Sequence, residues 1–191
     1  MTLSDKYREA LILAFDLHRF QERKGSGVPY MAHVLGVSSL VIENGADEDT
    51  AIAALLHDTV EDQGGHSTLA DVRERFGERV ATIVQGCTES AEDPKPPWRE
   101  RKERYLEHLK TASPEVQLVA ASDKLYNLQS ILADHAVVGE GLWDRFSGGR
   151  EGVLWYYRAA AHTFTIESRL VQALRNAVRE LERITSPGRS A

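Results

Sequence analysis

Four side chains that can bind a cation or accept a proton directly follow an apolar helical segment, residues 51–56: His57, Asp58, Glu61 and Asp62. Successive residues of an α-helix project about 100° apart, so His57 and Asp58 can hold one cation from two sides. Glu61 lies one turn beyond both, and Asp62 one turn beyond Asp58, which places both acids over the same spot. The pattern predicts two metal ligands and a nearby base that activates water. The alternative is an ordinary helix end with a solvated acidic face.

Two further residues extend this hypothesis. His33 lies in the first turns of the preceding helical segment, and Asp123 lies inside an otherwise apolar segment, residues 116–128. A bare carboxylate is very costly to bury, so Asp123 needs either a cation or a basic partner. Lys124 or Arg23 could be that partner. The sequence leaves both options open for Asp123.

Helical periodicity dominates the rest of the chain, which predicts an all-α fold. We find no internal repeat, no alternation of strands and helices, and no glycine-rich phosphate loop. We expect one domain over residues 1–185 and a disordered tail over 186–191. Proline, glycine and capping residues delimit the expected helices, which cover residues 3–23, 29–45, 47–60, 67–77, 78–90, 98–111, 113–138, 151–165 and 167–185, with a loop at 93–97 and a glycine-punctuated stretch at 139–149.

Composition restricts the classes of function. The net charge of −6 argues against broad, nonspecific binding to nucleic acid or to an acidic membrane, but it allows a small phosphorylated ligand. The apolar runs are too short to span a bilayer. Cys87 is the only cysteine, so any metal site must use histidines and carboxylates. Together with an N-terminus unlike a signal peptide, it favours a reducing cytoplasm.

The order His33, then His57-Asp58, then Asp123 resembles the signature of the HD superfamily of metal-dependent phosphohydrolases. The segments 23–33, 53–62, 68–77 and 123–128 look like the hydrolase half of RelA/SpoT proteins, and equally like the small alarmone hydrolases and the metazoan SpoT homologue. The resemblance implies a single-domain HD-type helical bundle. That family cleaves the 3′-pyrophosphate from guanosine alarmones and releases pyrophosphate.

The resemblance also assigns roles to residues of this chain. One divalent ion, Mn²⁺ in that family, would be bound by His33, His57, Asp58 and Asp123. Glu61 and Asp62 would orient and deprotonate the attacking water. The nucleotide would be contacted by Arg23, Lys24 and Asn127.

This chain departs from the family pattern around the substrate. The loop at Gly25-Ser26-Gly27 has an extra residue compared with the long RelA/SpoT enzymes, which could alter base recognition. Tyr126 replaces a histidine, and Lys124 replaces an arginine. Hydrolysis of a guanosine or adenosine 3′-pyrophosphate is therefore the first hypothesis. The alternatives are a broader nucleotide phosphohydrolase, such as an NADPH 2′-phosphatase, and a non-catalytic module that binds metal or nucleotide.

Other basic residues have weaker patterns. Lys102 lies in the segment 98–106, where bases and aromatic residues alternate, and we interpret that segment as an ordinary packed helix from which Lys102 could reach substrate phosphates. Arg145 and Arg150 border the glycine-punctuated stretch. They could close over a polyphosphate, although solvated loop arginines are more common.

Overall fold

In the computed structural model, which describes residues 1–90, 92 and 94–186, every regular element is helical. The prediction of an all-α fold is confirmed. Within these residues the one β-type pairing is an isolated bridge between Glu22 and Pro29. Asp93, where the expected loop begins, and residues 187–191 of the expected tail lie outside the described residues. The helices in chain order are α1 (Asp5–His18), α2 (Met31–Glu43), α3 (Glu48–Leu56), α4 (Thr59–Asp62), α5 (His66–Phe76), α6 (Glu78–Cys87), α7 (Trp98–Thr111), α8 (Pro114–Val138), the 3₁₀ helix η1 (Gly139–Arg145), α9 (Gly149–Thr163) and α10 (Arg169–Thr185).

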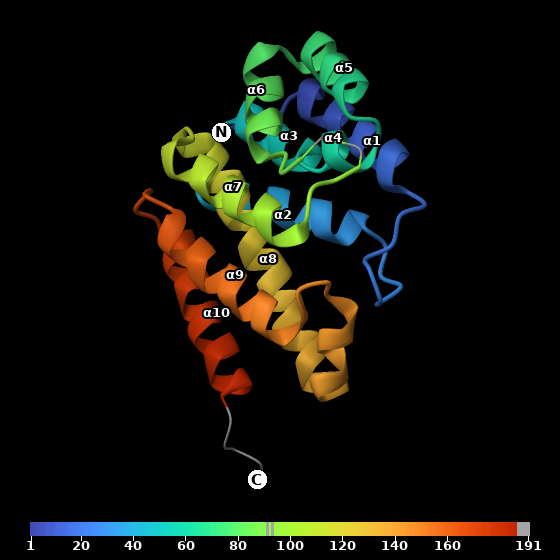
Figure 1. Cartoon of the computed structure of the whole chain (residues 1–191). Helices are drawn as coiled ribbons and strands as arrows, with labels where there is room; N and C mark the ends of the chain where they lie inside the picture. Colours follow the sequence, from blue (N-terminus) through green and yellow to red (C-terminus); the bar gives the residue numbers. More distant parts are fainter. Residues whose placement is uncertain (91, 93, 187–191) are drawn as a thin grey trace.

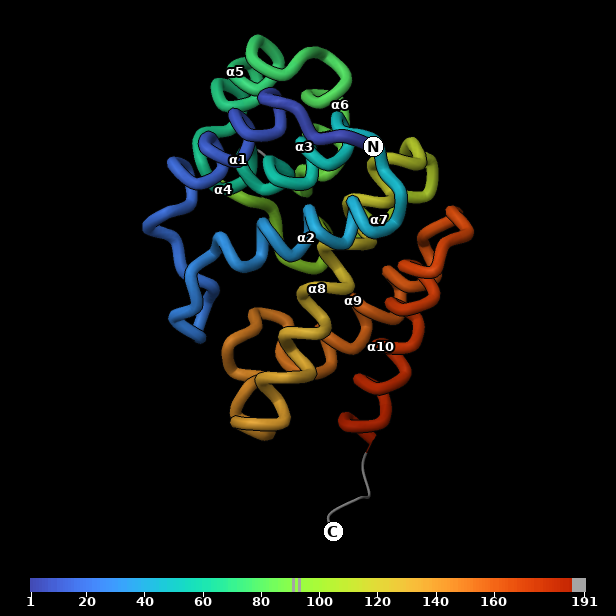
Figure 2. The backbone as a smooth tube through the Cα atoms, turned by 180° about the vertical axis from the view of Figure 1, so that it is seen from behind, coloured from blue at the N-terminus to red at the C-terminus, as the bar shows by residue number. Residues whose placement is uncertain are grey.

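The long helix α8 connects the two ends of the molecule. Helices α1, α3, α5 and α6 lie at one end, whereas α9 and α10 lie at the other, and the view from behind shows the same division (Figures 1 and 2). Helices α2, α3 and α6 pack against α8, as do α9, α10 and η1. Because α8 has neighbours from both ends, buried residues occur along it from Val116 to Ile131, and Asp123 is among them.

Local chemistry explains where α8 begins and ends. The hydroxyl of Ser113 accepts a hydrogen bond from the backbone N–H of Val116, and Pro114 occupies the first turn, where its missing N–H costs nothing. The helix ends at Gly139, whose φ of +64° lies in the left-handed region that favours glycine. These signals were predicted from the sequence, and the structure confirms them.

The first expected helix was predicted too long. Helix α1 ends at His18 rather than near Arg23. Residues 19–30 form a return loop instead, in which the N–H of Arg23 donates to the carbonyl of Val28 at 2.8 Å and the N–H of Tyr30 donates to that of Gln21 at 2.8 Å. This loop leads the chain back past the site before α2 begins.

The third expected helix is interrupted. The prediction of one helix through Val60 is wrong, because α3 ends at Leu56 and α4 begins at Thr59. The side chain of Thr59 donates to the carbonyl of Leu56 at 2.7 Å, which satisfies a backbone group that the broken helix leaves free. His57 and Asp58 therefore occupy a turn between two helices.

Smaller differences concern the ends of two other segments. Helix α6 ends at Cys87, three residues before the expected end at Ser90. The glycine-punctuated stretch after α8 contains the 3₁₀ helix η1, which was not predicted. Among the described residues, no helix combines the length and apolar character needed to cross a membrane.

Candidate metal centre and substrate cavity

Three of the predicted metal ligands form a tight group. His33 from α2 and the turn residues His57 and Asp58 each offer one ligand atom, and these atoms lie within 4.8 Å of one another. The Nε2 atom of His33 is 3.3 Å from Nε2 of His57 and 3.3 Å from Oδ2 of Asp58. Nε2 of His57 is 3.0 Å from the same oxygen. The break between α3 and α4 thus brings His57 and Asp58 to one point.

Asp123 approaches this group from the middle of α8. Its Oδ1 atom lies 3.4 Å from Nε2 of His33 and 3.9 Å from Nε2 of His57. Two imidazole nitrogens and two carboxylate oxygens suit an octahedral divalent transition metal. The structure therefore brings together all four residues that the sequence suggested as ligands.

The hydrogen bonds around the group fit metal binding. Nδ1 of His57 lies 2.9 Å from the carbonyl oxygen of Ala54 and donates a hydrogen bond to it. When the ring is neutral, Nε2, which faces the other ligands, therefore carries the lone pair that can bind a metal. The hydroxyl of Tyr30 donates to Oδ2 of Asp58 at 2.5 Å and fixes that carboxylate. Both histidines are almost fully buried, at 1% and 3% exposure.

Charge at the site holds a proton on His57 in the metal-free protein. Burial disfavours the charged imidazolium, but the carboxylates of Asp58 and Asp123 outweigh this effect and raise the pKa of His57 to about 9. Burial also opposes ionisation of Asp58, yet His57 and His33 bring the pKa of Asp58 well below its usual value. Burial and the neighbouring Asp58 together raise the pKa of Tyr30, which keeps its hydroxyl a donor.

Asp123 has the basic partner that the sequence left open. Lys124, itself buried, donates to Oδ2 of Asp123, and the amide of Asn127 donates to Oδ1. The other candidate, Arg23, instead donates to the side-chain oxygen of Asn127 at 2.9 Å and lies over the ring of Tyr126. A chain of contacts thus links the loop at Arg23 to the metal centre.

The two acids predicted to act on water are held by different elements. Oε1 of Glu61 lies 2.9 Å from Nζ of Lys95 and 3.4 Å from Arg101 on α7. Oδ2 of Asp62 accepts a hydrogen bond from Gln21, in the return loop, at 2.8 Å. The expectation that both acids lie over one spot followed from a continuous helix. In the structure the break separates α4 from His57 and Asp58, and the adjacent Glu61 and Asp62, which project about 100° apart, have different partners.

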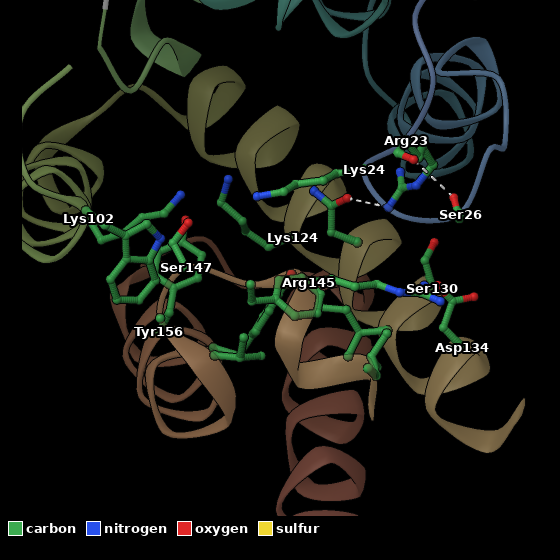
Figure 3. Close-up of a pocket in the computed structure, with 18 of the residues that line it drawn as sticks. Arg23, Lys24, Ser26, Lys102, Lys124, Ser130, Asp134, Arg145, Ser147 and Tyr156 are labelled. Atoms are coloured by element: carbon green, nitrogen blue, oxygen red, sulfur yellow. Dashed lines mark hydrogen bonds and ion pairs between the residues drawn. The ribbon is translucent and has the colours of Figure 1, made fainter. Parts of the chain in front are cut away.

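A cavity of about 360 Å³ adjoins the metal centre through Tyr30, Lys124 and Asn127. Its size is that of a small-molecule site. Figure 3 shows side chains from the return loop, α7, α8 and α9 around it. The basic residues that line the cavity are Arg23, Lys24, Lys102, Lys124 and Arg145, and Asp134 is the one acidic lining residue among the described part of the chain.

The residues expected to contact substrate differ in their present partners. Lys24 lines the cavity with an exposed side chain. Nζ of Lys102 pairs with the carboxylate of Glu89 and lies 4.6 Å from the centre of the Tyr156 ring. The rest of the Lys102 segment is an ordinary packed helix, as predicted, with its apolar face buried.

The two arginines near η1 have different positions. Arg145 lines the cavity, whereas Arg150 donates to the carbonyl of Thr185 at the end of α10 and is not among the lining residues. Of the two residues considered for closing over a polyphosphate, the structure places Arg145 alone in the cavity wall.

Several contributors were missed by sequence reasoning. Tyr30 lies in the segment 23–33 that resembles the family pattern, but nothing in the sequence indicates its hydrogen bond to Asp58. Glu89 is a nearly buried carboxylate that pairs with both Arg101 and Lys102. The side-chain amide of Gln21 connects the imidazole of His18 to the carboxylate of Asp62. Each acts through a neighbour distant in sequence, so local patterns could not reveal it.

Comparison with known proteins agrees with this architecture. A protein of Xenopus tropicalis named guanosine-3′,5′-bis(diphosphate) 3′-pyrophosphohydrolase MESH1 is 40% identical over 126 residues, which cover 64% of this chain and 68% of that protein. A protein of Aquifex aeolicus named guanosine-3′,5′-bis(diphosphate) 3′-pyrophosphohydrolase is 37% identical over 128 residues, which cover 67% of this chain and 18% of that protein.

Similarity extends to the three-dimensional structure. A solved structure described as a metazoan ortholog of SpoT that hydrolyses ppGpp superposes with a TM-score of 0.75 at 27% identity, and the match covers 96% of this chain and 97% of that one. A sequence model described as the HD domain matches residues 10–154. That range contains the whole candidate metal centre, and the chain belongs to the HD domain family.

Proposed function

We propose that this chain hydrolyses a purine nucleoside 3′-pyrophosphate and releases pyrophosphate. One observation carries the proposal: a cavity lined by five basic side chains opens beside the group formed by His33, His57, Asp58 and Asp123. The relatives named as guanosine-3′,5′-bis(diphosphate) 3′-pyrophosphohydrolases support the same substrate class.

We further propose that His33, His57, Asp58 and Asp123 hold one divalent ion, and that this ion is Mn²⁺. The membership of the HD domain family and the set of two nitrogens and two oxygens support a divalent transition metal. Such an ion, when bound, would polarise a phosphoryl oxygen and make water more acidic. The remaining chemistry falls to side chains of the protein.

The reaction needs a group that accepts a proton from water. An oxygen–phosphorus bond forms between water and the phosphorus attached to the 3′ oxygen, and the bond from that phosphorus to the 3′ oxygen breaks. The 3′ oxygen leaves and takes up a proton to give the 3′-hydroxyl of the nucleotide, and the phosphorus that gained the water oxygen is released as part of pyrophosphate. Glu61 and Asp62 are proposed to orient the water and to take its proton. Gln21 would steer Asp62, and Lys95 and Arg101 would steer Glu61, through the contacts described above.

Basic side chains must offset the net charge of −6 when a polyphosphate binds. Lys124 lies beside Asp123 and lines the cavity, so it can reach the phosphate nearest the metal centre. Lys102, Arg23 and Lys24 would bind the remaining phosphates, and Asn127 would contact the ribose or a phosphate.

The extent of the catalytic domain, its cellular compartment and its partner are also proposals. We propose that residues 1–185 form one catalytic domain, because helices from both ends of the chain pack on α8. A reducing cytoplasm suits the single cysteine, Cys87, which is buried. A small nucleotide, and not nucleic acid, is the expected partner.

A substrate panel tests the proposal. Purified protein with added Mn²⁺ is offered guanosine and adenosine 3′-pyrophosphates and NADPH, and the products are separated to distinguish pyrophosphate from orthophosphate. We expect pyrophosphate from the 3′-pyrophosphates. Lys102→Ala should raise KM, whereas Arg104→Ala, an exposed neighbour on α7 outside the cavity, should behave as wild type. Orthophosphate from NADPH, with the 3′-pyrophosphates untouched, would reject the proposal.

A further inference from the structure

The cavity has two ends with different chemistry. Lys102, Lys124 and Tyr156 lie at one end, and Ser130, Asp134 and the guanidinium of Arg145 lie at the other (Figure 3). The first end adjoins the metal centre through Lys124. The second end carries both a carboxylate and a guanidinium, which is unsuited to a phosphate because the carboxylate would repel it.

The second end lies at a distance from the metal centre. Asp123 and Asp134 are eleven residues apart on α8, a rise of roughly 16 Å at 1.5 Å per residue. Asn127, proposed to contact the ribose or a phosphate, lies between them along the same helix. If the 3′-pyrophosphate lies at the metal centre, a base attached to the ribose falls near Asp134 and Arg145.

The carboxylate and the guanidinium are held in a fixed arrangement. Nη1 of Arg145 donates to Oδ2 of Asp134 at 3.0 Å. The stem of Arg145 passes close to Gly25, where an added Cβ would lie only 2.8 Å from Cδ, and Gly25 has a φ of +75°. Gly25 of the return loop thus packs directly on the side chain of Arg145 and limits where its guanidinium can point.

Both partners retain capacity for a ligand. Oδ1 of Asp134 has no hydrogen-bond partner among the described residues, and neither do Nη2 and Nε of Arg145. The side chains are 41% and 26% exposed, so a ligand in the cavity can reach them. The free oxygen of Asp134 can accept a hydrogen bond and the free nitrogens of Arg145 can donate one. This pair therefore suits a purine base that has a donor next to an acceptor on its edge.

We infer that Asp134 and Arg145 read the edge of the purine and select guanine over adenine. This inference rests on the proposed function for the identity of the ligand. Guanine presents N1–H and its 2-amino group as donors beside the O6 acceptor, so the donors meet Asp134 and O6 meets Arg145. Adenine presents its 6-amino donor where guanine has O6, which faces the guanidinium, and it lacks the 2-amino group.

Binding without catalysis tests the inference directly. The affinities of GDP, IDP and ADP are measured by calorimetry in EDTA for the wild type, Asp134→Asn and Asp144→Asn. GDP and IDP differ only by the 2-amino group. We expect the wild type to bind GDP about tenfold to a hundredfold more tightly than IDP or ADP, the scale of a hydrogen bond to a charged group.

The variants separate recognition from a structural role. Asp134→Asn should lose most of the preference for GDP over IDP while it leaves the affinity for ADP nearly unchanged. Asp144→Asn, the same chemical change at an exposed residue of η1 outside the cavity, should keep the wild-type preference. Arg145→Gln should also weaken GDP more than ADP. The helical signal in far-ultraviolet circular dichroism is measured to check that each variant is folded.

The inference is overturned if the wild type binds the three diphosphates equally or binds none of them. It is also overturned if Asp134→Asn loses the same affinity for all three diphosphates. An equal loss in Asp134→Asn is what a purely structural contact between α8 and η1 would give. The proposed hydrolysis fails separately, because a protein that prefers GDP in EDTA but never releases pyrophosphate would retain the base-reading pair and lose the reaction.

Discussion

At the residue scale, His57 carries a proton in the metal-free protein that a cation must displace. Its pKa of about 9 lies above the usual value for histidine, so the ring is charged at neutral pH and becomes neutral only as the pH approaches 9. Metals bind neutral imidazole. Protonation of His57 therefore competes with the metal below pH 9.

This competition makes metal binding dependent on pH. We expect about one Mn²⁺ per chain, with an affinity that rises by up to about tenfold per pH unit between pH 6.5 and 8.5. His57→Ala should lose the ion, whereas His162→Ala, an exposed histidine on α9, should retain it. Equilibrium dialysis with elemental analysis measures both. A pH-independent affinity, or no bound metal in the reconstituted wild type, would contradict this account.

The buried ion pair between Asp123 and Lys124 is expected to affect the free energy of unfolding. Asp123→Ala leaves the buried ammonium of Lys124 without its carboxylate, so we expect unfolding to become easier by about 3–5 kcal/mol. The double variant Asp123→Ala, Lys124→Met should recover most of that loss, because it removes both buried charges. Urea unfolding in EDTA measures the difference, and a double variant no more stable than the single one would refute the role of the unpaired lysine.

Residue types and their order were enough to select the candidate ligands. His33, His57, Asp58 and Asp123 are all placed together in the structure, and their role as ligands stays a prediction. The partner of Asp123 was left open between two basic residues, because only the fold shows that Lys124 folds back onto its neighbour while Arg23 reaches Asn127.

At the scale of elements, the short helix α4 decides how the two acids act. We expect Glu61→Gln and Asp62→Asn, made singly, to lower turnover by roughly 10²-fold or more while the metal stays bound, because a general base is lost and the ligands are not. Glu74→Gln, an exposed acid on α5, is the matched control. Near-wild-type turnover in both variants would mean that neither acid accepts the proton.

The break between α3 and α4 could not be predicted from local sequence. No glycine or proline occurs at positions 57 and 58, and the apolar spacing continues to Val60. Long-range contacts decide the break, including the bond from Tyr30 to Asp58. In contrast, the ends of α8 were predictable because Ser113, Pro114 and Gly139 act within a few residues of the helix ends.

At the scale of the whole molecule, the cavity joins segments that are far apart in sequence. The return loop contacts Arg145, which lies more than a hundred residues later in the sequence, through Gly25, and residues of α8 line the same cavity. Periodicity identifies helices but not which of them enclose a cavity. The all-α fold was therefore predictable, whereas the base-reading pair of Asp134 and Arg145 and the role of Lys124 as a cavity wall were not.

The central claim is that water attacks the phosphorus next to the 3′ oxygen in the cavity beside the metal centre. Hydrolysis of a guanosine 3′-pyrophosphate in ¹⁸O-labelled water with Mn²⁺, followed by mass spectrometry of both products, measures this most directly. The account predicts one ¹⁸O atom in pyrophosphate and none in the nucleotide, with no reaction in EDTA. Label in the nucleotide, or orthophosphate in place of pyrophosphate, would contradict it.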